Sequence, residues 1–140
     1  MDQAEQLRNI IKQQNMKPHS ARVITVTSGK GGVGKSNVSV NLAIQMSRMG
    51  KKTVILDADF GLANIEIMLG IRPRYNLADM MFRGREVKDI ICTGPEGIGF
   101  ISGGSGLREM TNLNRDQILS LVRMMYELDH YADVVIIDTG

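Results

Sequence analysis

Residues 23–36 read VITVTSGKGGVGKS, a passage from a strand pattern through a glycine-rich turn to the start of a helix. The first five residues of this segment are all β-branched, which is typical of a short buried strand. Glycines allow the chain to curl tightly in the turn, because they have no Cβ atom to hinder it. Helical spacing of apolar residues follows from about Lys35. This order of elements predicts a loop that binds phosphate groups.

The turn matches the pattern G-x-x-x-x-G-K-[ST] in full, with Gly29, Lys30, Gly31, Gly32, Val33, Gly34, Lys35 and Ser36. In such a loop successive backbone N–H groups point at phosphate oxygens, and the positive end of the next helix adds to the attraction. The pattern assigns Lys35 to the β- and γ-phosphates and the Ser36 hydroxyl to Mg²⁺. Lys30 can reach a phosphate of its own subunit or of a facing one, or lie in solvent.

Strands and helices alternate along the rest of the chain. Further strands are expected at 53–56, 98–101 and 133–137, and helices at 35–49, 62–69, 77–82 and from 114 onward, while 86–91 fits either type. In the first helix we expect the apolar face to consist of Val38, Leu42, Met46 and Met49. Alternation of this kind predicts an α/β fold with a mostly parallel sheet flanked by helices.

Two carboxylates follow apolar strand segments, Asp57 after 53–56 and Asp138 at the end of 134–137. Ligands of open α/β sheets bind at the carboxyl ends of the strands, so both side chains are candidates for a Mg²⁺ site beside the phosphate loop. The alternative is that each carboxylate caps a helix or forms a turn.

Composition limits the class of protein. The chain has 140 residues, 43% hydrophobic residues, a net charge of +2 and one cysteine, Cys92. This suits one domain in a reducing, cytoplasmic setting, without a disulfide framework, secretory signal or membrane span. The positive excess lies in residues 1–22, and the neutral remainder argues against a DNA-binding platform. Because the chain stops directly after a buried strand, we expect a fragment of a longer protein.

Three segments, 30–36, 56–64 and 135–140, resemble in their order the MinD/ParA family of P-loop ATPases with a deviant Walker A motif. The resemblance implies an incomplete ATPase domain over residues 21–140, truncated after the Walker B strand. It also implies binding of ATP, ADP and Mg²⁺, slow hydrolysis to ADP and phosphate, and an ATP-dependent homodimer.

The resemblance also implies roles for single residues. Lys30 would contact ATP across the dimer, Asp59 would position the attacking water, and Asn64 would lie at the dimer-facing switch. Asp57 and Asp138 would support the Mg²⁺ shell. Asn37 departs from the family, which usually has Thr or Ser there near the α-phosphate.

Residues 2–14 predict an amphipathic helix, and 15–20 a linker. The opening DQAEQLR resembles the D-Q-A-x-x-L-R segment of the FlhG (YlxH) family, MinD-like regulators of flagellar number and placement. This implies an arm over residues 1–20 that stimulates the partner GTPase FlhF through Asp2, Gln3, Leu7 and Arg8. The alternative is a helix that packs on its own domain.

Other functions stay open at this point. A partitioning ATPase would need a basic DNA-binding surface, and an iron–sulfur scaffold would need further cysteines. The family resemblance implies that an amphipathic C-terminal helix, beyond Gly140, attaches the full-length protein to the inner membrane face. The basic residues Arg72, Arg74, Arg83 and Arg85 are expected to form a solvated surface.

Overall fold

The computed structural model describes residues 21–27, 34–58, 64–104 and 113–139, together with residues 3, 4 and 6. The strands are β1 (Arg22–Val26), β2 (Thr53–Ala58), β3 (Ile91–Thr93), β4 (Gly99–Ser102) and β5 (Val134–Thr139). The helices are α2 (Lys35–Arg48), α3 (Asn64–Leu69), α4 (Leu77–Arg83), α5 (Val87–Ile90) and α6 (Arg115–Leu128), with a 3₁₀ turn, η1, at Pro95–Gly97.

The strands form one sheet in the order β1-β5-β2-β4-β3. Neighbouring strands run parallel except for β3, which is antiparallel to β4. The expected α/β fold with a mostly parallel sheet is therefore confirmed. The ambiguous range 86–91 holds both types of structure, because α5 ends at Ile90 and β3 begins at Ile91. The short link through η1 is too short for a crossover, so β3 can only pair as a hairpin.

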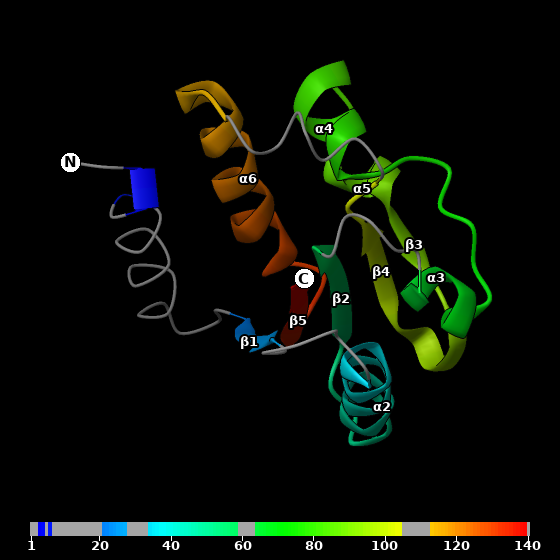
Figure 1. Ribbon diagram of the computed structural model, residues 1–140. Coiled ribbons are helices and arrows are strands. Elements are labelled where there is room, and N and C mark those ends of the chain that lie inside the picture. The colour runs from blue at the N-terminus through cyan, green and yellow to red at the C-terminus, as the bar shows by residue number, and fades with distance from the viewer. Residues whose placement is uncertain are drawn as a thin grey trace.

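Helices cover both faces of the sheet, and alternate strand residues supply the two cores (Figure 1). In β2, Val54 and Leu56 point to the side of α4, α5 and α6, while Ile55 points to the side of α2 and α3. Successive strand residues face opposite sides, and both sides are buried here, so the strands are apolar almost throughout.

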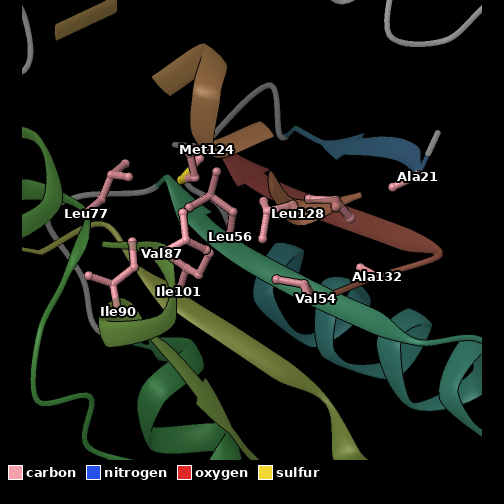
Figure 2. Close-up of a cluster of buried hydrophobic side chains, with 11 residues drawn as sticks. Ala21, Val54, Leu56, Leu77, Val87, Ile90, Ile101, Met124, Leu128 and Ala132 are labelled. Carbon is pink, nitrogen blue, oxygen red and sulfur yellow. The ribbon is translucent and has the colours of Figure 1, made fainter. Parts of the chain in front are cut away.

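Figure 2 shows the core between the sheet and helices α4, α5 and α6. Met124 and Leu128 of α6 reach down toward Leu56 of β2, and Val87 of α5 approaches from the other side. These contacts hold the three helices against one face and leave the opposite face to α2 and α3.

The predicted apolar face of the first helix is wrong in part. Val38 is 56% exposed and Met49 is 71% exposed, whereas Lys35, Ser39, Val40 and Ala43 are buried. The face that meets the sheet follows the ridge through residues 35, 39 and 43, since residues four apart share one side of a helix. Lys35 lies on this ridge, and the small side chains of Ser39 and Ala43 let the helix pack closely.

Paired caps begin two helices on the other face. The Asn76 side chain accepts a hydrogen bond from the N–H of Asp79, whose carboxylate accepts one from the N–H of Asn76. Asn114 and Gln117 repeat this capping box at α6, the helix predicted from residue 114 onward. Gly104 packs against the first of these caps with φ of +85°, and a Cβ atom there would lie 2.6 Å from Asn76 Nδ2.

We predict that Gly104→Ala lowers the free energy of unfolding by about 2–4 kcal/mol, because it adds a clash to the cost of a positive φ. Gly50 also has φ of +85° but open space around it, so Gly50→Ala should cost only about 1–2 kcal/mol. Urea denaturation of both variants measures the difference. Equal losses would mean that the Asn76 cap yields to the new methyl group.

Candidate functional site

Three neighbouring strands place a polar side chain on the same face at the carboxyl end of the sheet. Asp57 of β2 pairs in register with Asp138 of β5 on one side and with Ser102 of β4 on the other. All three are buried, with exposures of 4%, 0% and 6%. They follow the alternation of Ile55, which points toward α2 and α3, and so they lie on that side.

The first turn of α2 meets this row of side chains. Lys35 Nζ lies 2.6 Å from Asp138 Oδ1, and Ser36 Oγ donates a hydrogen bond of 3.2 Å to Asp138 Oδ2. Gly34 precedes the helix with φ of +81°, a left-handed conformation that glycine adopts at little cost. The start of α2 thus brings Lys35 and Ser36, the last two residues of the sequence motif, against a carboxylate from the far end of the chain.

The donor set fits a magnesium nucleotide. Mg²⁺ is usually held by one or two carboxylates and a hydroxyl, with phosphate oxygens and water completing its shell. Among the described residues no group of three or more His, Cys, Asp and Glu side chains could hold a metal. The two aspartates and Ser36 suit a cation that arrives with phosphate, and Lys35 suits the phosphate itself.

The structure places the other predicted site residues as follows. Asn37 is exposed on α2, and α3 begins at Asn64. The roles assigned to all these residues stay predictions. Outside the described residues lie Gly29, Lys30, Gly31, Gly32, Val33, Asp59, Asp2, Leu7, Arg8 and the side chain of Asn64.

Gln3, which the sequence assigns to a contact with a partner protein, forms a hydrogen bond within its own chain. Its Nε2 donates a hydrogen bond of 3.4 Å to the carbonyl oxygen of Leu113, just before α6. The contact is exposed and lies within the same chain. It accords with the alternative of an arm that packs on its own domain, and leaves the proposed partner role untested.

Sequence reasoning missed a polar contact beside the site. Ser102 Oγ donates a hydrogen bond of 2.6 Å to Glu66 Oε1 and accepts one of 3.2 Å from the N–H of Gly104. These bonds tie α3 to the end of β4. The position of Ser102 directly after an apolar strand segment is the same signal that singled out Asp57 and Asp138.

The basic residues between 72 and 85 are exposed, as expected, but they are not all independent. The guanidinium groups of Arg85 and Arg74 lie 4.0 and 5.5 Å from the centre of the Tyr75 ring. Arg83 forms an ion pair with Asp79 one turn earlier in α4.

Over the residues that the structure describes, no helix is long and apolar enough to cross a bilayer.

The sheet is mostly parallel, a glycine precedes helix α2, and the first turn of that helix carries a lysine and a hydroxyl that face an aspartate at the end of a strand. These features define a P-loop NTPase. Comparison with known proteins identifies the family within this class. A ParA model described as a NUBPL iron-transfer P-loop NTPase matches residues 19–138. The chain belongs to the ParA family of P-loop NTPases.

Individual relatives agree with this assignment. The antiactivator FleN of Pseudomonas aeruginosa is 40% identical over 122 residues, which cover 87% of this chain and 44% of FleN. The flagellum site-determining protein YlxH of Helicobacter pylori is 32% identical over 153 residues, covering 99% of this chain and 49% of YlxH. The chain thus spans about half the length of these relatives.

Solved structures show the same fold. The septum site-determining protein MinD of Pyrococcus horikoshii, complexed with Mg-ADP, superposes with a TM-score of 0.65 and 26% identity. The match covers 86% of this chain and 50% of that MinD chain. The described sheet and helices therefore correspond to part of a MinD-type domain.

Burial and the nearby negative charge of Glu66 raise the pKa of the Cys92 thiol. Less thiolate is then present near neutral pH than for a free cysteine, so we predict slow alkylation by iodoacetamide. Glu66→Gln should speed it, because the amide removes the charge and keeps an oxygen that can accept from Ser102. Because the folded-state pKa is raised, the thiol's contribution to stability is present below the unfolded pKa and lost as pH rises through the folded one.

The control for this experiment is Ser102→Ala, which removes the hydrogen bond and keeps the Glu66 charge. Its alkylation rate should stay below that of Glu66→Gln at pH values below the thiol pKa, where the thiolate fraction limits the rate. A series of rates from neutral pH up to the alkaline plateau gives the thiol pKa. An unchanged pKa in Glu66→Gln would contradict the electrostatic part of the explanation.

Proposed function

We propose that the chain is the nucleotide-binding part of an ATP-dependent switch that regulates flagellar number and placement. The observation that carries the proposal is the cluster of Lys35, Ser36 and Asp138. Asp138 lies 103 positions after Lys35 in the sequence and yet contacts both motif side chains. The similarity to the flagellum site-determining protein YlxH supports the flagellar setting, and the similarity to the antiactivator FleN supports a regulatory role. The MinD complex with Mg-ADP supports ATP or ADP with Mg²⁺ as ligands.

The described residues can perform the binding half of such a cycle. Lys35 supplies a positive charge to the terminal phosphates, and the N–H groups at the start of α2 point the same way. Mg²⁺ would offset phosphate charge when bound, with Ser36, Asp57 and Asp138 near it. Because Lys35, Asp57 and Asp138 are buried on strands and a helix, they would hold the phosphates in place at little cost of reorganisation.

The proposal assigns hydrolysis and dimer formation to Lys30, Asp59 and Asn64. In the proposed cycle ATP joins two subunits, Lys30 reaches the nucleotide across the interface, and Asp59 orients the attacking water. Asp59 follows β2 two residues after Asp57, and Asn64 opens α3 at the other end of that segment. Slow hydrolysis would then separate the subunits, which makes the enzyme a timer. The membrane contact of the full-length protein belongs to the same proposal.

Residues 1–20 form the second part of the proposal. The arm would engage the partner GTPase FlhF through Asp2, Gln3, Leu7 and Arg8, and stimulate its hydrolysis of GTP. Support comes from the D-Q-A-x-x-L-R pattern and from the similarity to YlxH, which spans 99% of this chain. The hydrogen bond from Gln3 to Leu113 is exposed, so the glutamine can exchange it for a partner.

A second candidate is iron transfer, which the description of the matching ParA model favours. Cysteine thiolates hold iron–sulfur clusters, and this sequence has Cys92 alone. A cluster at this chain would therefore need ligands from elsewhere. Absorbance near 400 nm after anaerobic reconstitution with iron and sulfide would favour this candidate over the flagellar switch.

Three variants test the ATPase proposal. Lys35→Ala should weaken ATP binding by at least about 100-fold, since it removes the main phosphate cation. Lys30→Ala should keep binding in the monomer and abolish ATP-driven dimers. Asp59→Ala should keep the dimers and stop turnover. Calorimetry, analytical ultracentrifugation and phosphate release measure the three steps on the full chain.

Lys88→Ala provides the control, because Lys88 is exposed on α5 and belongs to no proposed site. It should leave all three measurements unchanged. Rapid ATP loss in Asp59→Ala would overturn the role of Asp59, and dimers in Lys30→Ala would overturn the contact across the interface. Undiminished ATP binding in Lys35→Ala would reject the nucleotide site.

A synthetic peptide of residues 1–20 tests the arm. We expect it to accelerate GTP hydrolysis by purified FlhF by at least about tenfold, since groups supplied in trans can raise the turnover of a GTPase by about 10³- to 10⁵-fold. The same peptide with Gln3→Ala should lose most of the effect, whereas Gln14→Ala, at the end of the predicted helix, should keep it. Equal activity of the three peptides, or none, would reject the partner role.

A further inference from the structure

Ser102 ends β4 with a hydroxyl that bonds to two other segments of the chain. Its Oγ donates to Glu66 Oε1 at 2.6 Å and accepts from the N–H of Gly104 at 3.2 Å. An ionised carboxylate can only accept a hydrogen bond and an N–H can only donate one, so the direction of both bonds is fixed. The shorter distance is typical of a hydroxyl bound to a carboxylate, a contact that is stronger than one between neutral groups.

This hydroxyl lies at the carboxyl edge of the sheet, beside the proposed nucleotide site. Ser102 is buried and pairs in register with Asp57, which is itself the register partner of Asp138. Ser102 is therefore one strand away from a carboxylate that the proposed function assigns to the cation. Its hydrogen bonds run instead to α3 and to the backbone that follows β4.

The bond to Glu66 gives α3 a polar anchor. This helix has only six residues, and a helix so short depends on its contacts with the rest of the domain. Ile65 and Leu69, four residues apart on one side of the helix, are buried in the core, while Ile67 and Met68 are exposed. Apolar burial has no preferred direction. The hydrogen bond of Glu66 therefore adds the directional contact that fixes the first turn of α3 relative to β4.

The backbone after β4 is supported from the other face of the sheet. Gly104, which donates to Ser102, leaves no room for a Cβ atom beside Asn76, and Asn76 caps α4. Helix α4 contributes to the core on one face, and α3 to the core on the opposite face. The Ser102 hydroxyl thus ties the start of α3 to a segment that is already held in place.

We infer that Ser102 is a positioning residue for ATP hydrolysis, because its bond to Glu66 sets the first turn of α3. The inference rests on the proposed function, which assigns the attacking water to Asp59 and the dimer-facing switch to Asn64. Helix α3 begins at Asn64, two residues before Glu66, and only residues 59–63 join it to the end of β2. A shift of α3 therefore moves one end of the short connection that carries Asp59.

Ser102→Ala removes the hydroxyl and keeps the carboxylate of Glu66. On the full chain we expect kcat for phosphate release to fall by about tenfold, since a small misplacement of a positioning group slows turnover strongly. The dissociation constant of ADP with MgCl₂ should stay within about twofold, because no proposed contact with phosphate or cation is lost. Phosphate release at saturating ATP and calorimetry measure the two quantities. Equal losses in both, or an unchanged kcat, would overturn the inference.

Ser39→Ala is the matched control. Ser39 is a buried serine of α2 whose Oγ has no hydrogen-bond partner in the part of the chain that the structure describes. Loss of that hydroxyl should leave both turnover and ADP affinity unchanged. A fall in turnover as large as that of Ser102→Ala would mean that any buried hydroxyl near the site has this effect, and would reject the specific role of Ser102.

Variants of Glu66 test the other side of the bond. Glu66→Gln keeps an oxygen that can accept from Ser102 and should keep most of the turnover, whereas Glu66→Ala should lose as much as Ser102→Ala. If the two residues act through their shared bond, the double alanine variant loses no more turnover than either single one. Independent losses that multiply would overturn the inference. Because Glu66 is only half-buried, its variants also serve where Ser102→Ala does not fold.

Hydrogen exchange without nucleotide separates this inference from the proposed function. In Ser102→Ala the backbone amides of residues 64–71, measured by mass spectrometry, should exchange about tenfold faster than in the unaltered chain, because α3 loses its polar anchor. Unchanged exchange would overturn the inference even where the chain hydrolyses ATP. An unaltered chain that binds ADP but releases no phosphate would overturn the role of Ser102 and keep the nucleotide site. Absence of ADP binding would reject the proposed function as well.

Discussion

The ion pair between Lys35 and Asp138 constrains much of the rest of the structure. A lysine that is buried needs a nearby negative charge, and Asp138 offers it at the end of β5. The start of α2 must therefore lie over the carboxyl edge of the sheet, with Lys35 turned inward. That orientation places Ser39 and Ala43, four and eight residues on, against the strands.

The same strands supply both the core and the site. Ile55 and Ile136 are fully buried under α2 and α3, and two residues further along each strand stand Asp57 and Asp138. A single face of the sheet is thus apolar in its middle and carries carboxylates at its edge. The tight packing of the apolar part fixes the positions of the charged part, which suits a site that must be organised before its ligand arrives.

The sequence predicts the parts of this arrangement that depend on local signals. The start of α2 at Lys35, the cap of α6 at Asn114 and the two strand-end aspartates are such parts, and the structure brings Lys35, Ser36 and Asp138 together. It does not predict the buried side of α2, because Leu42 and Met46 suggest a stripe that the Lys35 contact overrides. Their neighbours Val38 and Met49 are consequently left exposed.

The sequence also does not predict the hydrogen bond between Ser102 and Glu66 or the antiparallel strand β3. The bond from Ser102 to Glu66 joins residues 36 positions apart, and neither residue has a local feature that points to the other. The antiparallel β3 was also missed, because a strand of three residues carries too little periodicity to separate it from the end of a helix.

The alternation along β2 and β5 limits how chains with this sheet can change in length. One residue inserted between Ile55 and Asp57 would turn the carboxylate away from α2 and into the hydrocarbon around Met124 and Leu128. Two inserted residues would restore the face and break the register with Asp138. A substitution within these strands changes one side chain and keeps the others in place. An insertion or deletion instead moves every later side chain of the strand to the other face or to a new register. Length variation among such proteins should therefore collect in the connections between the strands and the helices.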